Sequence, residues 1–132
     1  MARPCPCGRK LTFETCCGPR LSGAVPAPTA VDLMRSRFTA YGEGAVAYLI
    51  ATTAPETREA LDAAELTAYC AALRLVKLEI LETQAGAATD DAGFVTFRAT
   101  LRHRGEKFTQ TERSRFRREA GAWLYVDGDP LD

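Results

Sequence analysis

The sequence has no long apolar run, one histidine and no net charge. No stretch of its 132 residues approaches the ~20 apolar residues that span a bilayer, which excludes a membrane-spanning helix. Residues 1–20 lack the apolar centre of a signal peptide, so we expect a cytoplasmic protein with no membrane partner. Seventeen basic residues balance seventeen acidic ones, so the bulk charge does not point to a polyanionic partner. His103 stands two residues before a glycine where a hairpin is predicted, which favours an exposed position over a catalytic one.

Cysteine, in contrast, is concentrated near the start of the chain. Four of the five cysteines fall within thirteen residues, and these are Cys5, Cys7, Cys16 and Cys17. Because a reducing cytosol disfavours structural disulfides, the cluster favours a metal site. A disulfide between the neighbours Cys16 and Cys17 would join Cα atoms ~3.8 Å apart, closer than the usual ~4.4–6.8 Å. A redox pair and a set of inert thiols are the alternatives.

Zinc is the ion that four cysteines favour. Zn²⁺ takes four tetrahedral ligands, with Zn–S distances near 2.3 Å. Four thiolates would close the coordination sphere and leave no position for water, so we expect one structural Zn²⁺. Basic residues beside the cluster offset the negative charge of four thiolates, and these are Arg3, Arg9, Lys10 and Arg20. The fifth cysteine, Cys70, lies in an apolar helical pattern and is a predicted core residue.

Composition and periodicity divide the chain into three parts. Residues 1–20 form the predicted metal-binding module, and residues 21–30, which hold two prolines and no charge, form a predicted linker. Residues 31–132 predict one α+β domain. Its helices are expected at 31–41, 45–51, from Pro55, and at 60–73, with Asp32 and Thr53 as N-caps. Its strands are expected near 75–81, 94–103, 109–118 and 122–126, with a loop at 84–93.

The order of these elements predicts the architecture. Consecutive strands without helices between them imply an antiparallel sheet, and the apolar stripe of the preceding helices would cover one of its faces. In 94–103, alternate residues predict a core-facing set of Val95, Phe97, Ala99 and Leu101.

The third predicted strand carries a candidate pocket. Glu112 and Ser114 share a face with apolar residues at both ends, and a carboxyl held there could act as a base. The alternative, which we favour, is a structural ion pair between Glu112 and Arg35 or Arg37 on the packed helix. No second acid–base partner is evident, so an enzyme is the less favoured interpretation.

The opposite face of this strand and its hairpin partner is basic. Residues 98–118 hold eight Lys or Arg against two Asp or Glu. The candidate interaction face consists of Arg98, Arg102, Arg113, Arg115 and Arg117. Such a face could bind RNA or an acidic protein, although it lacks interleaved aromatic residues. A solvated sheet face is the plainer alternative.

The chain also resembles a known family. The pattern Cys5-Pro6-Cys7-Gly8, Phe13 and Cys16-Cys17-Gly18 resembles the SEC-C zinc motif, known from the C-terminus of the SecA translocation ATPase. Further segments resemble the YchJ family (UPF0225): Leu33–Phe38, Tyr48–Ile50, Gly93–Val95, Glu112–Phe116 and Trp123–Gly128. The resemblance implies a small N-terminal zinc knuckle joined to an NTF2-like cone, in which helices pack on a curved antiparallel sheet. The loop after Cys7 departs from the family's Gly-Ser-Gly-Lys run and reads Gly8-Arg9-Lys10-Leu11.

Three functions follow from these patterns. The leading hypothesis is a zinc-binding interaction module with a protein or ribosomal partner, because the SEC-C module of SecA contacts a chaperone and the ribosome. The first alternative is an NTF2-like enzyme or small-ligand binder that uses the pocket of the cone. The second alternative is RNA binding through the basic sheet face.

Overall fold

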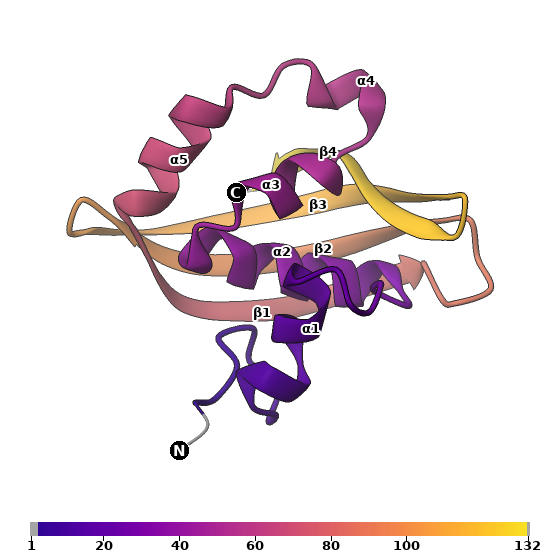
Figure 1. The fold of residues 1–132 in the computed structure, drawn as a ribbon, viewed down its shortest axis with the longest axis horizontal. Helices are drawn as coiled ribbons and strands as arrows, with labels where there is room; N and C mark the ends of the chain where they lie inside the picture. Colours follow the sequence, from indigo (N-terminus) through magenta and orange to yellow (C-terminus); the bar gives the residue numbers. More distant parts are fainter. Residues whose placement is uncertain (1–2, 132) are drawn as a thin grey trace.

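The computed structural model describes residues 3–131 and confirms the α+β class (Figure 1). The short 3-10 helix η1 and the α-helices span η1 Phe13–Thr15, α1 Cys17–Leu21, α2 Ala30–Glu43, α3 Val46–Ala51, α4 Pro55–Arg58 and α5 Ala63–Ala71. The strands span β1 Leu73–Ala85, β2 Ala92–His103, β3 Glu106–Glu119 and β4 Ala122–Leu131. None of the helices in this range is both long and apolar enough to cross a membrane.

The four strands form one antiparallel sheet in the order β1-β2-β3-β4, as the lack of intervening helices predicts. Two-residue turns at Arg104-Gly105 and Ala120-Gly121 join the later strands, and both residues of each turn have positive φ. Such turns match the right-handed twist of the strands that they connect, and glycine adopts them without steric cost. The helices lie over one face of the sheet, and the N-terminal segment lies beside its β1 edge (Figure 1).

The main core lies between α2 and the covered face of the sheet. The predicted core-facing set of β2 is confirmed: Val95, Phe97, Ala99 and Leu101 are all buried. They pack with Leu33, Met34 and Phe38 of α2 in one apolar cluster. Because side chains alternate along a strand, the intervening residues of β2 lie on the opposite face.

Several element boundaries differ from the sequence prediction. Helix α2 begins at Ala30 and its N-cap is Thr29, whose side chain accepts a hydrogen bond from the backbone N–H of Asp32 at 3.1 Å. Asp32 is therefore the third helical residue, not the cap. Helix α4 has Ala54 as its N-cap, and the side chain of Thr53 instead donates to the Leu49 carbonyl at 2.7 Å.

The remaining differences are in length. Helix α5 is shorter than the predicted 60–73, because β1 begins at Leu73, whose side chain is buried in the core. Strand β1 extends through Ala85, and β2 begins at Ala92, so the predicted loop at 84–93 is reduced to residues 86–91. Both extensions result from pairing between β1 and β2. The hydrophobic periodicity of one strand gives no information about such pairing.

The segment between α1 and α2 packs against the sheet. Ala27 of this segment and Ala30, the first residue of α2, are buried in the main core, and the indole N–H of Trp123 donates to the Pro28 carbonyl at 3.2 Å. The backbone N–H of Ala30 donates to the Gly86 carbonyl at 3.0 Å. These contacts fix the start of α2 over the end of β1.

The contact between Gly86 and Gly93 supplies a test of this arrangement. A Cβ atom at Gly93 would lie 2.5 Å from the backbone N and Cα of Gly86. We expect Gly93→Ala to lower the free energy of unfolding by about 1–3 kcal/mol, because backbone must move to admit the methyl group. Urea unfolding followed by circular dichroism measures this difference. Ala92→Ser, at the exposed neighbouring position, is the control and should change stability by less than ~0.5 kcal/mol; equal effects would contradict the packing described.

Candidate metal centre and cone cavity

The N-terminal segment forms a tight loop that brings the cysteines together. Pro4 pairs with Thr12 in an antiparallel bridge, and the N–H of Cys5 donates to the Leu11 carbonyl at 2.9 Å. Gly8 adopts φ 92°, in the left-handed region, and so turns the chain directly after Cys7. Cys5 and Cys7 lie on this loop, whereas Cys16 and Cys17 lie where η1 passes into α1. All four side chains are buried.

The sulfur positions fit a tetrahedral metal ion. All four Sγ atoms lie within 4.8 Å of one another. A Zn–S distance of ~2.3 Å places sulfur atoms at tetrahedral corners about 3.8 Å apart. The Sγ atoms of Cys7 and Cys16 are 3.7 Å apart, and those of Cys16 and Cys17 are 4.0 Å apart. The four cysteines could therefore hold one metal ion.

Electrostatics also favour a cation at this point. A hydrogen bond from Cys17 lowers the pKa of Cys7 to about 4, whereas burial raises the pKa of Cys16 to about 11. The hydrogen bond with Cys7 likewise raises the pKa of Cys17. One thiolate thus suppresses ionisation of its neighbours. Four thiolates in this space require a cation at their centre to offset their mutual repulsion.

One face of α2 holds the cysteine loop. The Arg35 guanidinium donates from Nη1 to the Cys7 carbonyl at 2.7 Å, and Arg9 of the loop forms an ion pair with Asp32. Thr39 Oγ1 lies 4.0 Å from Cys5 Sγ. Arg35 is therefore a contact of the cysteine loop and does not line the pocket predicted for it, because its position on α2 faces the loop and not the sheet.

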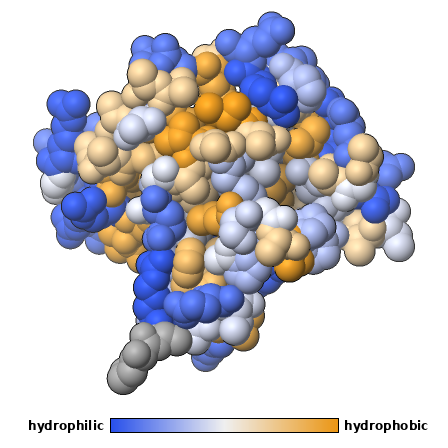
Figure 2. Space-filling view, in the orientation of Figure 1, coloured by the Kyte–Doolittle hydropathy of each residue, from blue (hydrophilic) through white to orange (hydrophobic). Residues whose placement is uncertain are grey.

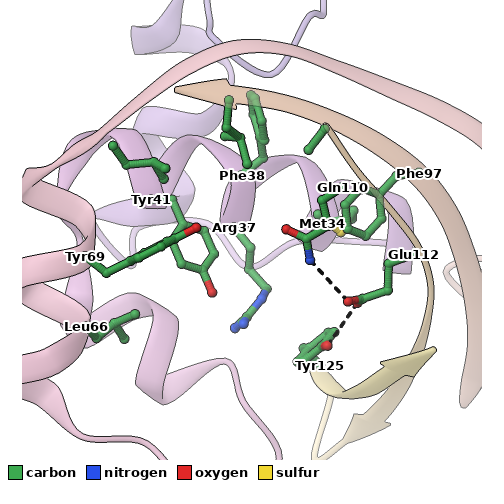
Figure 3. Close-up of a pocket in the computed structure, with 13 residues that line it drawn as sticks. Met34, Arg37, Phe38, Tyr41, Leu66, Tyr69, Phe97, Gln110, Glu112 and Tyr125 are labelled. Atoms are coloured by element: carbon green, nitrogen blue, oxygen red, sulfur yellow. Dashed lines mark hydrogen bonds between the residues drawn. The ribbon is translucent and has the colours of Figure 1, made fainter. Parts of the chain in front are cut away.

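The opposite side of α2 borders a cavity of about 310 Å³ beneath the covered face of the sheet (Figure 3). Aromatic and aliphatic side chains form most of its wall. The lining residues are Met34, Arg37, Phe38, Tyr41, Leu66, Tyr69, Leu73, Phe97, Ala99, Leu101, Gln110, Glu112 and Tyr125. The side chains of Arg37 and Glu112 bring charged groups into this otherwise apolar and tyrosine-rich space.

Arg37 reaches the cavity from the middle of α2 and is 6% exposed. Its Nη1 donates to the Leu49 carbonyl at 2.9 Å and to the hydroxyls of Thr52 and Thr53 at 2.8 and 3.2 Å. Its guanidinium also lies over the Tyr125 ring, 4.7 Å from the ring centre. Burial lowers the pKa of Arg37, but an arginine stays charged at neutral pH. The C-terminal end of α3 and the ring stabilise this buried cation.

Glu112 lies on the wall opposite α2, where β3 faces the core. The register places Glu112 opposite Phe97 and Ser114 opposite Val95, so both belong to the covered face. Glu112 Oε2 accepts hydrogen bonds from Ser114 Oγ at 2.5 Å and Tyr125 Oη at 3.0 Å. Burial raises the pKa of Tyr125, so its hydroxyl remains a donor. Within residues 3–131, no ion pair joins Glu112 to Arg37 or Arg35.

The arginines of the outer sheet face are largely paired with acidic residues. Arg115 contacts Asp127 and Asp129 of β4, and Arg117 contacts Glu56 of α4 at 2.6 Å. Arg98 lies 3.9 Å from Glu79. Arg113 packs over the Phe94 ring, 3.8 Å from its centre, whereas Arg102 lies exposed opposite Arg74 and Lys107. The acidic partners reduce the positive charge that this face offers to a phosphate backbone.

Two tyrosines that line the cavity, Tyr69 and Tyr125, were not among the site residues predicted from the sequence. Tyr69 stacks on His103 with ring centres 4.9 Å apart, which places the single histidine beside α5 and not among the lining residues. Tyr125 lies in the alternating pattern of β4 and could have been placed on the covered face from that pattern. Tyr69 could not, because it requires the path of α5 over the sheet.

These features define a class of protein: an NTF2-like cone preceded by a SEC-C cysteine loop. The family model described as "YchJ, middle NTF2-like domain" matches residues 29–128. The chain belongs to the UPF0225 (YchJ) family. It is 47% identical to the UPF0225 protein SCO1677 of Streptomyces coelicolor over 130 residues, covering 98% of this chain and 97% of that protein. It is 41% identical to a UPF0225 protein of Corynebacterium glutamicum over 129 residues, covering 98% of both.

Solved structures show the same fold. The SEC-C motif containing protein RPA3114 of Rhodopseudomonas palustris, solved in solution, matches with a TM-score of 0.87 and 32% identity, over 98% of this chain and all of that one. A SEC-C motif containing protein of Psychrobacter arcticus matches with a TM-score of 0.81 and 24% identity, over 95% of this chain and 81% of that one. The predicted family and fold are thereby confirmed.

The cysteine cluster makes a quantitative prediction for metal content. Purified protein should hold one metal ion per chain, and Cys16→Ser should lose most of it, because a hydroxyl replaces one of four thiolate ligands. Inductively coupled plasma mass spectrometry measures the content. Cys70→Ser is the matched control, since Cys70 lies in a separate apolar cluster. Equal metal content in the two variants, or none in the parent protein, would contradict the site.

Proposed function

We propose that this chain is a small-ligand-binding protein of the cone type, whose cysteine loop holds a structural Zn²⁺. The observation that carries the proposal is the cavity of about 310 Å³, whose mainly apolar lining includes the charged side chains of Arg37 and Glu112. Ligand sites are typically apolar concavities of ~300–1,000 Å³ with a few placed polar groups. The cavity lies at the lower end of that range, so it suits a small molecule.

The residues of the cavity favour binding over catalysis. Among the described lining residues there is neither histidine nor cysteine, and the one carboxyl is Glu112. One oxygen of Glu112 already accepts from the hydroxyls of Ser114 and Tyr125. Its other oxygen, Oε1, receives only a 3.4 Å contact from Gln110, but no histidine, cysteine or second carboxyl stands among the described lining residues to share proton transfer with it. The arrangement therefore supports recognition of a ligand better than proton transfer.

Zinc is the metal that the cysteine set supports best. Thiolates are soft ligands, and four of them at tetrahedral separations match structural zinc sites. Four sulfur ligands leave no open position for water, so the ion would stabilise the loop and not take part in chemistry. Arg35 and Thr39 would then act on the ligand loop from α2, through the Cys7 carbonyl and beside Cys5 Sγ.

Fragment binding tests the function of the cavity. A mixed library of neutral, anionic and cationic fragments should yield binders that shift the amide NMR signals of Phe97, Ala99 and Leu101. Ala99→Leu should abolish these shifts, because the larger side chain fills part of the cavity. Ala71→Leu makes the same change at an exposed position of α5 and is the matched control. No binder at millimolar concentration, or binding unaffected by Ala99→Leu, would contradict the proposal.

A second candidate function is docking of the cysteine loop onto a protein or ribosomal partner. The observation that favours it is Leu11, which is 49% exposed between the two cysteine pairs and follows the exposed Lys10. Leu11 would offer an apolar contact and Lys10 a positive charge to the surface of such a partner.

Co-sedimentation with purified ribosomes tests this candidate. The protein should pellet with ribosomes at low salt, and Leu11→Ser and Lys10→Glu should each reduce the pelleted fraction at least ~3-fold. Leu61→Ser, at another exposed leucine, should pellet as the parent does. Absence of the parent protein from the pellet, or equal pelleting of all variants, would contradict ribosome docking.

A further inference from the structure

The guanidinium of Arg37 is satisfied on one side only. Its five N–H donors lie on Nε, Nη1 and Nη2. The three hydrogen bonds that it makes within residues 3–131 all leave from Nη1, toward α3 and the residues after it. Nε and Nη2 have no protein acceptor in that range. They are not sealed in protein either, and Arg37 lines the cavity, so these donors border it.

The open edge of Arg37 selects ligands that can accept its hydrogen bonds. A ligand that fills the cavity without offering an acceptor would leave these charged donors desolvated and unpaired, which is strongly unfavourable. The Nε–H and Nη2–H groups of one guanidinium point in parallel and match the two oxygens of a carboxylate. Figure 3 shows the Arg37 side chain extending into the space between Tyr41 and Tyr125, where such a group would meet it.

We infer that the cavity recognises a small organic acid with one carboxylate and an apolar body, held by its carboxylate against the Nε–Nη2 edge of Arg37. This inference rests on the proposed ligand-binding function and adds the chemical class of the ligand. The net positive charge of Arg37 compensates the single negative charge of the acid, so neither charge is left buried alone.

The apolar walls of the cavity define the rest of the ligand. Phe38, Tyr41, Leu66, Tyr69 and Phe97 present rings and aliphatic groups to the cavity. Burying an apolar body against them is favourable because it removes apolar surface from water. Figure 2, in the orientation of Figure 1, shows apolar surface exposed below the segment that contains α4 and α5, on the side where the cavity lies. A ring or a short alkyl chain on the acid suits these walls.

Glu112 limits the acid to one negative charge. Its carboxyl lines the same cavity, held by Tyr125 and Ser114, while its Oε1 receives only a long contact of 3.4 Å from Gln110. A second carboxylate on the ligand, or a phosphate dianion, would approach this group and be repelled. The cavity should therefore prefer monoacids to diacids and to inorganic phosphate.

Matched pairs of compounds test the inference on the full chain as purified. The probes are phenylacetate, 3-phenylpropionate and hexanoate, each compared with its primary amide, together with phenethylamine, 1,4-phenylenediacetate and inorganic phosphate. Affinities come from titration of the amide NMR signals of Ala99 and Leu101. We expect at least one monoacid to bind at least ~10-fold more tightly than its amide, which is the effect of one charge-assisted contact. Phenylenediacetate and phosphate should bind more weakly than that monoacid.

Variants locate the effect at Arg37. Arg37→Lys keeps the charge but removes the two parallel N–H donors that bind a carboxylate bidentately. The ratio of the affinities for acid and amide should therefore fall at least ~5-fold. Arg102→Lys makes the same change on the exposed sheet face and should leave it unchanged. Because Arg37 also forms hydrogen bonds to the C-terminal end of α3, the thermal melting of Arg37→Lys must be compared with that of the parent protein. If that variant does not fold, Glu112→Gln supplies the test. This variant should reduce the difference in affinity between phenylacetate and phenylenediacetate.

The possible results distinguish the preference for organic acids from ligand binding by the cavity in general. Amides or phenethylamine that bind as tightly as the acids would overturn the acid assignment and leave a ligand-binding cavity. Phosphate that binds as tightly as the best monoacid would overturn the organic-acid assignment in favour of a general anion site. Failure of every probe and of the fragment library would overturn both the inference and the proposed function.

Discussion

The burial of α2 on three sides is the constraint on which the rest of the structure depends. Helical residues three or four positions apart share a face. One face meets the cysteine loop through Asp32, Arg35, Thr39 and Glu43. A second face lines the cavity through Met34, Arg37, Phe38 and Tyr41. A third face contacts α3, where Ser36 Oγ lies 2.7 Å from Tyr48 Oη and Ala40 packs on Leu49. A helix of this length is marginal alone in water, so these contacts supply its stability.

This arrangement joins the two candidate sites through one rigid element. The loop that carries Cys5 and Cys7 is short and has little apolar surface, so it cannot fold around its own core. Four thiolates gathered on one ion would fix it internally, and the bonds to Arg35 and Asp32 fix it to α2. On the other side of the same helix, Arg37 is held by the C-terminal end of α3. The charged residues of α2 therefore attach the cysteine loop and the end of α3 to this helix through hydrogen bonds, in addition to apolar packing.

The sequence predicts those features that depend on local spacing. The alternation in β2 predicts which residues face the core, and the crowding of four cysteines within thirteen residues predicts their cluster. Arg35 and Arg37 show where local spacing ends. They are two positions apart and so lie about 200° apart around the helix, which sends one to the cysteine loop and the other to the cavity. Which of the two arginines faces the cavity that Glu112 lines depends on how α2 is rotated about its axis over the sheet. That rotation is set by tertiary packing and cannot be read from local spacing.

Arg37 is also where the structure departs from what stability alone would favour. A methionine or leucine at this position would fill part of the cavity and would remove the cost of burying a charge. Instead, the chain holds a guanidinium with one side bound to α3 and the other side open to the cavity. Its partner of opposite charge, Glu112, is engaged by hydroxyl groups and forms no ion pair with it in the described residues. Because Arg37 and Glu112 are not paired with each other, the open edge of Arg37 stays available to a third group, whereas a structural ion pair would have closed that space. Residues that lower stability in this way are expected at functional sites, where a side chain is retained for binding and not for packing.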